Sequence, residues 1–162
     1  MKNMLNKLVS LTFLTALSFG GMCDDLQQQN KPEQAITTPI HQLFDGMREH
    51  DQQKILAQFS QQALLQRITA KGEIVDSDVK KFAESISKSS AKLDEQLLSE
   101  TVLHQRQLAS VWTPFVFYLN DKISHCGTNS FQMVQINGEW KIQYLIDVTY
   151  QGDCQTFIKQ HN

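Results

Sequence analysis

The sequence predicts an α+β fold, in which three N-terminal helices are followed by an antiparallel sheet. Three observations lead to this prediction. Apolar residues recur at helical spacing in the first half of the chain, they alternate with polar residues from Thr101 onward, and Asn137-Gly138 marks a tight hairpin between two alternating runs. Helices followed by a meandering sheet are typical of an α+β domain.

Residues 1–22 have the pattern of a secretory signal peptide, because Lys2 and Lys7 precede an uncharged apolar stretch over 8–19 and small residues follow it. That stretch is shorter than the roughly 20 apolar residues that span a bilayer. We therefore expect a periplasmic or secreted protein. Cys23 leaves a lipoprotein open, anchored to the membrane through this cysteine, although the residues before it match the usual Leu-Ala-Gly poorly.

The charge of the chain argues against nucleic acid as a partner. The formal net charge is −2, and loss of Lys2 and Lys7 with the signal peptide changes it to −4. Binding to nucleic acid requires clustered Lys and Arg, which this mildly acidic chain does not have. The five histidines are scattered without the spacing of metal ligands. We expect no metal and no cofactor.

The predicted domain covers 38–162, after a polar, Gln-rich linker over 23–37 without periodicity. A first helix is expected to begin at Pro39, capped by Thr38, because an apolar stripe follows at i, i+3, i+4 and i+7. Asp51 caps a second helix. A small hairpin is expected around Lys71-Gly72, and a third helix from about Ser77 to Leu97, with a weak point at "SKSSAK".

Four strands follow, with the sequences "TVLHQRQ", "LASVWTPFVFYL", "KISHCGTNSFQMVQI" and "EWKIQYLIDVTY". Asn120-Asp121 is a second, weaker hairpin signal. If both turns are two-residue loops, they set the register of three neighbouring strands and therefore which side chains share a face. The last twelve residues, "QGDCQTFIKQHN", carry no clear signal.

Two segments, "LASVWTPFVFYLNDKISHCGTNSFQMV" and "GEWKIQYLIDVTY", resemble the nuclear transport factor 2-like (NTF2-like) superfamily, which includes ketosteroid isomerase, scytalone dehydratase and SnoaL-like cyclases. The nearest resemblance is to small bacterial members, some of them named for lumazine binding. The resemblance covers roughly 39–150 and implies the cone-shaped fold, in which three N-terminal helices pack on the concave face of a curved antiparallel sheet. Enzymes, binding modules and assembly domains share this fold, so the resemblance does not choose a function.

Counting from the two turns predicts a ligand pocket on the inner face of the sheet. Polar side-chain tips inside an apolar cone are typical of a small-molecule site. Cys126 is expected to point outward because neighbouring strand residues face opposite ways, so it cannot form a catalytic pair with His125. The predicted pocket residues are Trp112, Tyr118, His125, Asn129 and Tyr150.

The same count places Phe115, Phe117 and Leu119 on the outer face, which is then too apolar for solvent. Members of the superfamily often dimerise through this face, so the resemblance implies a homodimer with these three residues in the interface. The alternative is that a terminal segment such as "CQTFIKQ" covers the patch.

The predicted function is binding of a small apolar molecule by an exported protein. The alternative is an isomerase, dehydratase or cyclase in the same pocket, with His125 as the catalytic proton carrier. A second alternative is a dimerising structural module. The register directs Asp147 outward and places no carboxylate in the cone near His125, which favours binding. An inward-facing carboxylate would favour the enzyme.

A disulfide between Cys126 and Cys154 stays open at this stage. The register sets Cys126 opposite Thr149, five residues short of Cys154. Because a disulfide needs Cα atoms within about 7 Å of each other, the chain would have to turn back at Gly152.

Overall fold

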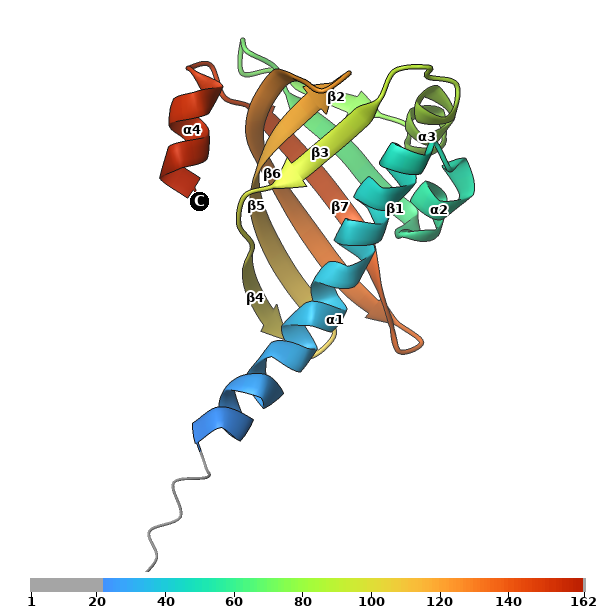
Figure 1. Cartoon of the computed structure of the whole chain (residues 1–162). Helices are drawn as coiled ribbons and strands as arrows, with labels where there is room; N and C mark the ends of the chain where they lie inside the picture. Colours follow the sequence, from blue (N-terminus) through green and yellow to red (C-terminus); the bar gives the residue numbers. More distant parts are fainter. Residues whose placement is uncertain (1–21, 162) are drawn as a thin grey trace, which may run out of the picture.

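The computed structural model describes residues 22–161 (Figure 1). The expected signal peptide, apart from Met22, lies outside the described residues. The helices are α1 (Met22–Glu49), α2 (Gln52–Ala57), α3 (Val79–Ser87) and α4 (Cys154–His161). The strands are β1 (Phe59–Ile68), β2 (Ile74–Ser77), β3 (Leu93–Leu97), β4 (Thr101–Gln105), β5 (Leu108–Leu119), β6 (Lys122–Ile136) and β7 (Glu139–Thr149).

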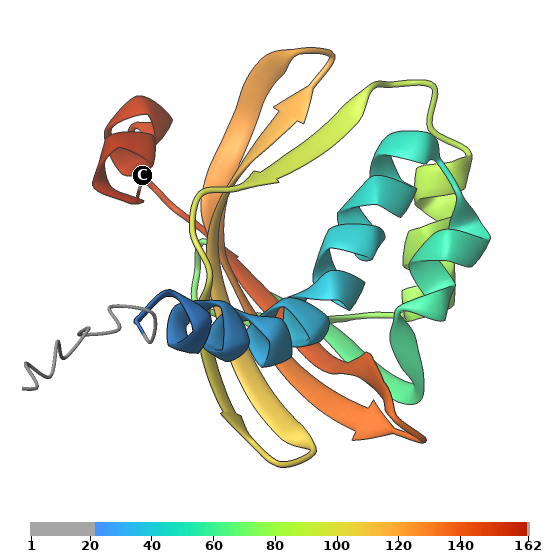
Figure 2. The ribbon, with the colours of Figure 1, turned by 60° about the horizontal axis from the view of Figure 1, so that its bottom comes forward.

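The seven strands form one curved sheet in the order β2-β1-β7-β6-β5-β3, and β4 pairs with another part of β5. This sheet is mixed rather than antiparallel as predicted, because β1 runs parallel to β7 while the other pairs are antiparallel. The small hairpin expected around Lys71-Gly72 does form, as β1 and β2, but it joins the edge of the sheet. Helices α1, α2 and α3 lie on one side of the sheet and α4 on the other (Figure 2).

Helix α1 starts well before Pro39, so the residues expected to form a linker are helical. The reason lies in the apolar stripe, which extends back to Ile36: Ile36 and Ile40 are both fully buried, and Thr37 is buried beside them. Burial of this additional turn favours helix through Pro39, although the proline lacks one backbone donor. The role of 23–37 as a tether stays a prediction.

The third helix is shorter than expected, because α3 ends at Ser87. The weak segment "SKSSAK" ends it, and the chain then enters the sheet as β3, where Leu93 pairs with Leu119 of β5. The C-terminal residues, which carried no clear signal, form α4 on the outer face, with Phe157 buried against Val116 and Cys126. The C-terminal segment named in the alternative thus packs on the outer face, but against Val116 and Cys126 rather than against the predicted apolar patch.

Both predicted turns are two-residue loops. All four of their residues have positive φ: Asn120 51°, Asp121 64°, Asn137 52° and Gly138 87°. Leu119 pairs with Lys122, and Ile136 pairs with Glu139, as a two-residue loop requires.

Two β-bulges nevertheless shift the register beyond these turns. One bulge lies at Ser124, because Tyr118 pairs with Ile123 but Phe117 pairs with His125. The other lies at Gln143 of β7, which is skipped between Ile142 and Tyr144. Each extra residue moves the pairing by one position and so exchanges the two faces of the partner strand. All of β5, and β7 from Tyr144 onward, therefore face opposite to the prediction.

Gly127 lets the inner face of β6 close tightly. A Cβ atom added at this position would lie 2.1 Å from the carbonyl oxygen of Val148 and 3.1 Å from the ring of Phe115. The aromatic ring of Phe115 thus fills the space above Gly127, and no larger residue fits there without moving the backbone.

Candidate active site on the inner face of the sheet

The structure brings together only two of the five predicted pocket residues. His125 and Asn129 line a cavity of about 450 Å³ between the sheet and the helices. Trp112, Tyr118 and Tyr150 lie on the outer face because of the bulges. Trp112 is 53% exposed, Tyr118 packs in the outer cluster around Val116, and the ring of Tyr150 stacks on Phe157 at 4.9 Å.

The three residues predicted for a dimer interface are also placed differently. Phe115 is buried at 1% exposure, and Phe117 lines the cavity. Both belong to the inner face, so their expected outward orientation is corrected. Leu119 is exposed at the end of β5. The homodimer itself stays a prediction.

One wall of the cavity is apolar and comes mainly from helices α1 and α3, whereas the sheet supplies a group of polar side chains. The apolar wall consists of Leu43, Phe44, Met47, Phe82 and Ile86, together with Leu65, Val75, Phe117 and Leu145 from the strands. The polar group that we describe below consists of Arg67, Glu95, His125, Asn129 and Asp147.

The polar side chains are linked in pairs across the sheet. Asn129, Asp147 and Arg67 are register partners on β6, β7 and β1. The Nε of Arg67 donates to Oδ2 of Asp147 at 2.7 Å, and Nδ2 of Asn129 donates to Oε1 of Glu95 at 2.7 Å. The expectation that Asp147 points outward is therefore wrong, and so is the expectation that no carboxylate enters the cone. The bulge at Gln143 turns Asp147 inward.

The environment of Glu95 disfavours its charged form. Burial raises the pKa of Glu95 to about 7, and the charge of Asp147 adds to this, whereas the hydrogen bond from Asn129 and the charge of Arg67 oppose it. By solvent-accessible area Glu95 is only partly buried. The carboxyl group itself lies among packed side chains of the cavity, and this local surrounding governs its ionisation. Near neutral pH, Glu95 thus exists in both protonation states.

Burial shifts the pKa values of Asp147 and His125 in opposite directions. Burial raises the pKa of Asp147, and the charge and hydrogen bond of Arg67 oppose this, which leaves an ion pair with an almost buried carboxylate. Burial, aided by the charge of Arg67, lowers the pKa of His125 below its ordinary value of 6.5. His125 is therefore neutral at pH 7 and can either donate or accept a hydrogen bond.

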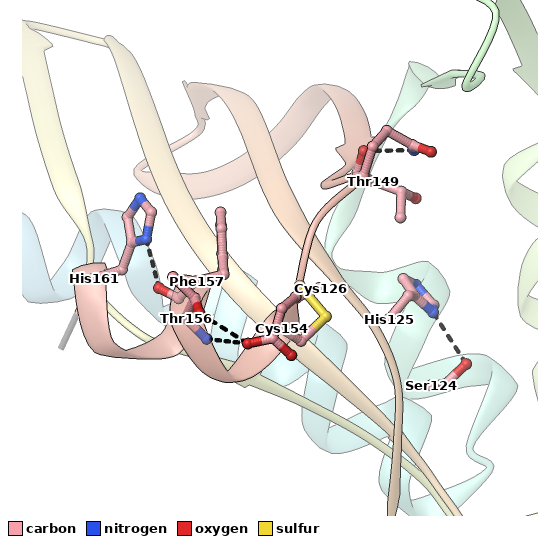
Figure 3. Close-up of a disulfide and its surroundings, with 10 residues drawn as sticks. Ser124, His125, Cys126, Thr149, Cys154, Thr156, Phe157 and His161 are labelled. Atoms are coloured by element: carbon pink, nitrogen blue, oxygen red, sulfur yellow. Dashed lines mark hydrogen bonds between the residues drawn. A yellow bond between two sulfur atoms is a disulfide. The ribbon is translucent and has the colours of Figure 1, made fainter.

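The ring of His125 lies against two phenylalanines, with ring centroids 5.0 Å from Phe117 and 5.8 Å from Phe115. Its Nδ1 is hydrogen-bonded to Oγ of Ser124 at 3.2 Å, rather than to Tyr118 or Tyr150 as expected. Figure 3 shows this ring turned away from the neighbouring Cys126. The prediction that His125 and Cys126 face opposite ways is confirmed.

Cys126 is bonded to Cys154, with Cα atoms 5.7 Å apart (Figure 3). The chain turns back at Gly152, where a Cβ atom would lie 2.6 Å from the ring of Tyr150. The disulfide attaches α4 to the outer side of the strand that carries His125. Disulfides persist in oxidising compartments, which fits the expected export. None of the helices within 22–161 is both long and apolar enough to cross a membrane.

Three solved structures share this architecture. A proposed scytalone dehydratase from Novosphingobium aromaticivorans is similar with a TM-score of 0.65 and 12% identity, over 78% of this chain and 89% of that one. An NTF2-like protein of unknown function from Shewanella baltica has a TM-score of 0.57 and 12% identity over 76% and 97%. The chain has the NTF2-like fold. A proposed dehydratase of the NTF2-like family from Streptomyces avermitilis has a TM-score of 0.63 and 6% identity over 76% and 99%.

No protein-family model and no curated protein sequence matches the chain. At 6 to 12% identity the NTF2-like neighbours establish the fold alone. The residues of the cavity must therefore support any functional argument by themselves.

Sequence reasoning missed Arg67 and Glu95 and misplaced Asp147. Asp147 did give a signal, as the one charged residue in the apolar run "LIDVTY" at the end of β7. Glu95 was assigned to a helix, although Leu93 and Leu97 also fit the two-residue period of a strand. Arg67 gave no signal of its own, because its role depends on the parallel pairing of β1 with β7.

Proposed function

We propose that the protein is an enzyme that moves protons on a small, largely apolar molecule in the inner cavity, as dehydratases and isomerases do. The single observation that carries this proposal is the carboxyl group of Glu95, which faces an apolar cavity and has a pKa of about 7. General acid–base catalysis is most effective when the pKa of the catalytic group lies near the working pH. Glu95 thus replaces His125 as the principal proton carrier.

The neighbouring side chains have separate roles in this proposal. Asn129 is a positioning residue, because its amide holds the Glu95 carboxylate in place through one oxygen and leaves the other oxygen for the substrate. Neutral His125 offers Nε2, which has no hydrogen-bond partner within the described chain, as a second donor or acceptor. The apolar wall excludes water and so strengthens these polar interactions.

Binding without catalysis is the competing function, and the mostly apolar lining fits it equally well. Proton transfer gives a direct use for a carboxyl group that titrates near pH 7 in an apolar cavity, whereas binding of an apolar molecule does not require such a group.

The proposal can be tested before the natural substrate is known, with 5-nitrobenzisoxazole as a probe of carbon acidity. A base removes the proton from the ring carbon, the N–O bond breaks, and its electron pair leaves on the phenolate oxygen of a coloured nitrile product. We expect a protein-dependent rate that rises with pH through about 7, as Glu95 loses its proton. Glu95→Gln should lower this rate by about a hundredfold or more.

The matched control is Glu139→Gln, which removes an exposed carboxylate at the β6–β7 turn. It should leave the rate unchanged. A wild-type rate in Glu95→Gln, or a wild-type protein whose rate does not exceed that of buffer alone, would contradict the proposal.

A further inference from the structure

We infer that the ligand of this cavity carries a carboxylate, held by the unused edge of the Arg67 guanidinium, while its apolar body lies against the helices. This inference deepens the proposed function and rests on the same cavity. It concerns the recognition of the ligand rather than its chemistry, so the two can fail separately.

Arg67 is the only positively charged side chain among the residues that line the cavity. Its Nε is occupied by Asp147, whereas neither of its two terminal nitrogens has a hydrogen-bond partner within residues 22–161. The side chain is 54% exposed, in contrast to Asp147, which is almost buried. Arg67 therefore stands where the cavity opens to solvent.

The ion pair fixes the direction in which the free edge of Arg67 points. A guanidinium is planar, so a hydrogen bond from Nε to Asp147 also orients the two terminal N–H groups. These groups form a fork that matches the two oxygens of a carboxylate. An arginine that is already oriented loses less entropy when it binds such a group than a free surface arginine does.

The remaining charges in the cavity favour an acid over an amine as the ligand's polar group. Asp147 is engaged by Arg67, and Glu95 is partly protonated near neutral pH. A ligand carboxylate gains two directed hydrogen bonds, although Asp147 offsets much of the net charge of Arg67. We therefore expect a preference of about tenfold rather than one of many thousandfold.

Three probes with the same apolar body test this: 4-phenylbutyrate, 4-phenylbutanol and 4-phenylbutylamine. Their dissociation constants are measured by calorimetry on the full chain at pH 6.5. We expect the acid to bind about ten times more tightly than the alcohol, and the amine to bind no more tightly than the alcohol. Above pH 7 the preference for the acid should shrink, because ionised Glu95 repels a second carboxylate.

Substitutions test whether Arg67 is the source of the preference for the acid. Arg67→Gln should bring the acid and the alcohol to equal affinity. If this variant fails to fold because the charge of Asp147 is left unpaired, Arg67→Gln/Asp147→Asn removes both charges and should give the same result. Arg106→Gln removes the same charge at the β4–β5 turn, outside the cavity, and should keep the preference.

Glu95→Gln separates this inference from the proposed function. It should keep the preference for the acid at every pH even though it abolishes proton transfer. The inference is overturned if the alcohol binds as tightly as the acid, if Arg67→Gln keeps the preference, or if none of the three probes binds at millimolar concentration.

Discussion

The two faces of the sheet differ in how they treat charge and apolar surface. On the inner face, Asp147 is buried, Glu95 is partly buried, and both carboxyl groups have partners: Asp147 accepts from Arg67, and Glu95 accepts from Asn129. On the outer face, α4 covers one end through the disulfide and Phe157, while large apolar side chains elsewhere remain exposed. Leu103 is 71% exposed, and Leu64 is 58% exposed.

This difference separates function from assembly in physical terms. Burying a polar group costs free energy even when a hydrogen bond offsets part of it, and contiguous exposed apolar surface typically marks a site of interaction. The inner face thus indicates chemistry, and the outer face indicates a partner. Each prediction below alters one face and asks whether the other responds.

The disulfide should have the largest effect on stability. Replacing Cys126 and Cys154 by alanine in one protein opens a loop of 28 residues, which should lower the free energy of unfolding by about 3 kcal/mol. Urea denaturation measures this loss. Since the bond lies on the outer side of β6, the rate with 5-nitrobenzisoxazole at 25 °C should stay within about twofold of wild type. A loss of rate as large as that of Glu95→Gln would show that the two faces are coupled.

Glu95→Gln should change stability in a pH-dependent manner. The folded state holds the proton of Glu95 up to a pKa of about 7, compared with an ordinary 4.5, so the unfolded state ionises first. The wild type therefore loses stability as pH rises from 4.5 through 7, by roughly 3 kcal/mol for this group. Glutamine removes that loss.

Denaturation of both proteins at pH 4.5 and pH 8 tests this directly. The variant should match the wild type at pH 4.5 and exceed it at pH 8, while Glu139→Gln should show no such divergence. An equal difference between variant and wild type at the two pH values would contradict the raised pKa.

The smallest expected effect concerns the outer face. We propose that a second copy of the chain covers it, as predicted from the sequence, but through Leu64, Leu103, Leu108 and Trp112 rather than Phe115 and Phe117. Trp112→Glu should weaken the dimer by roughly thirtyfold, because it places an unpaired charge in the contact. Sedimentation velocity measures the shift, with Gln151→Glu as an exposed control. A wild type that is monomeric at 100 µM would end this proposal.

The alternation of residues and the two turns were sufficient to predict four strands and the orientation of His125, Asn129 and Cys126, whereas the cone followed from the resemblance to the NTF2-like superfamily. They were insufficient to predict which way the side chains of β5 and of the second half of β7 point, because a bulge has no strong sequence signature. Ser124 and Gln143 are ordinary strand residues, yet each one exchanges the faces of everything beyond it. The disulfide was unpredictable for a related reason: it depends on a turn at Gly152 and on a helix whose sequence has no clear period.

Only those residues of the candidate site that lie on one strand could be predicted to share a face. His125 and Asn129 both belong to β6, whose own alternation holds throughout the site. Glu95, Asp147 and Arg67 come from three other strands, and their meeting depends on pairings that only the folded chain shows. A site built across several strands thus requires the correct register of all of them.

The central claim is that Glu95 titrates near neutral pH inside the cavity. Carbon-13 NMR of protein labelled at the glutamate carboxyl carbon measures this directly, with the resonance assigned by its absence in Glu95→Gln. We expect this resonance to titrate with a midpoint near pH 7. A midpoint for Glu95 at or below about 4.5 would contradict the account, because the cavity would then hold an ordinary carboxylate with no proton to exchange at neutral pH.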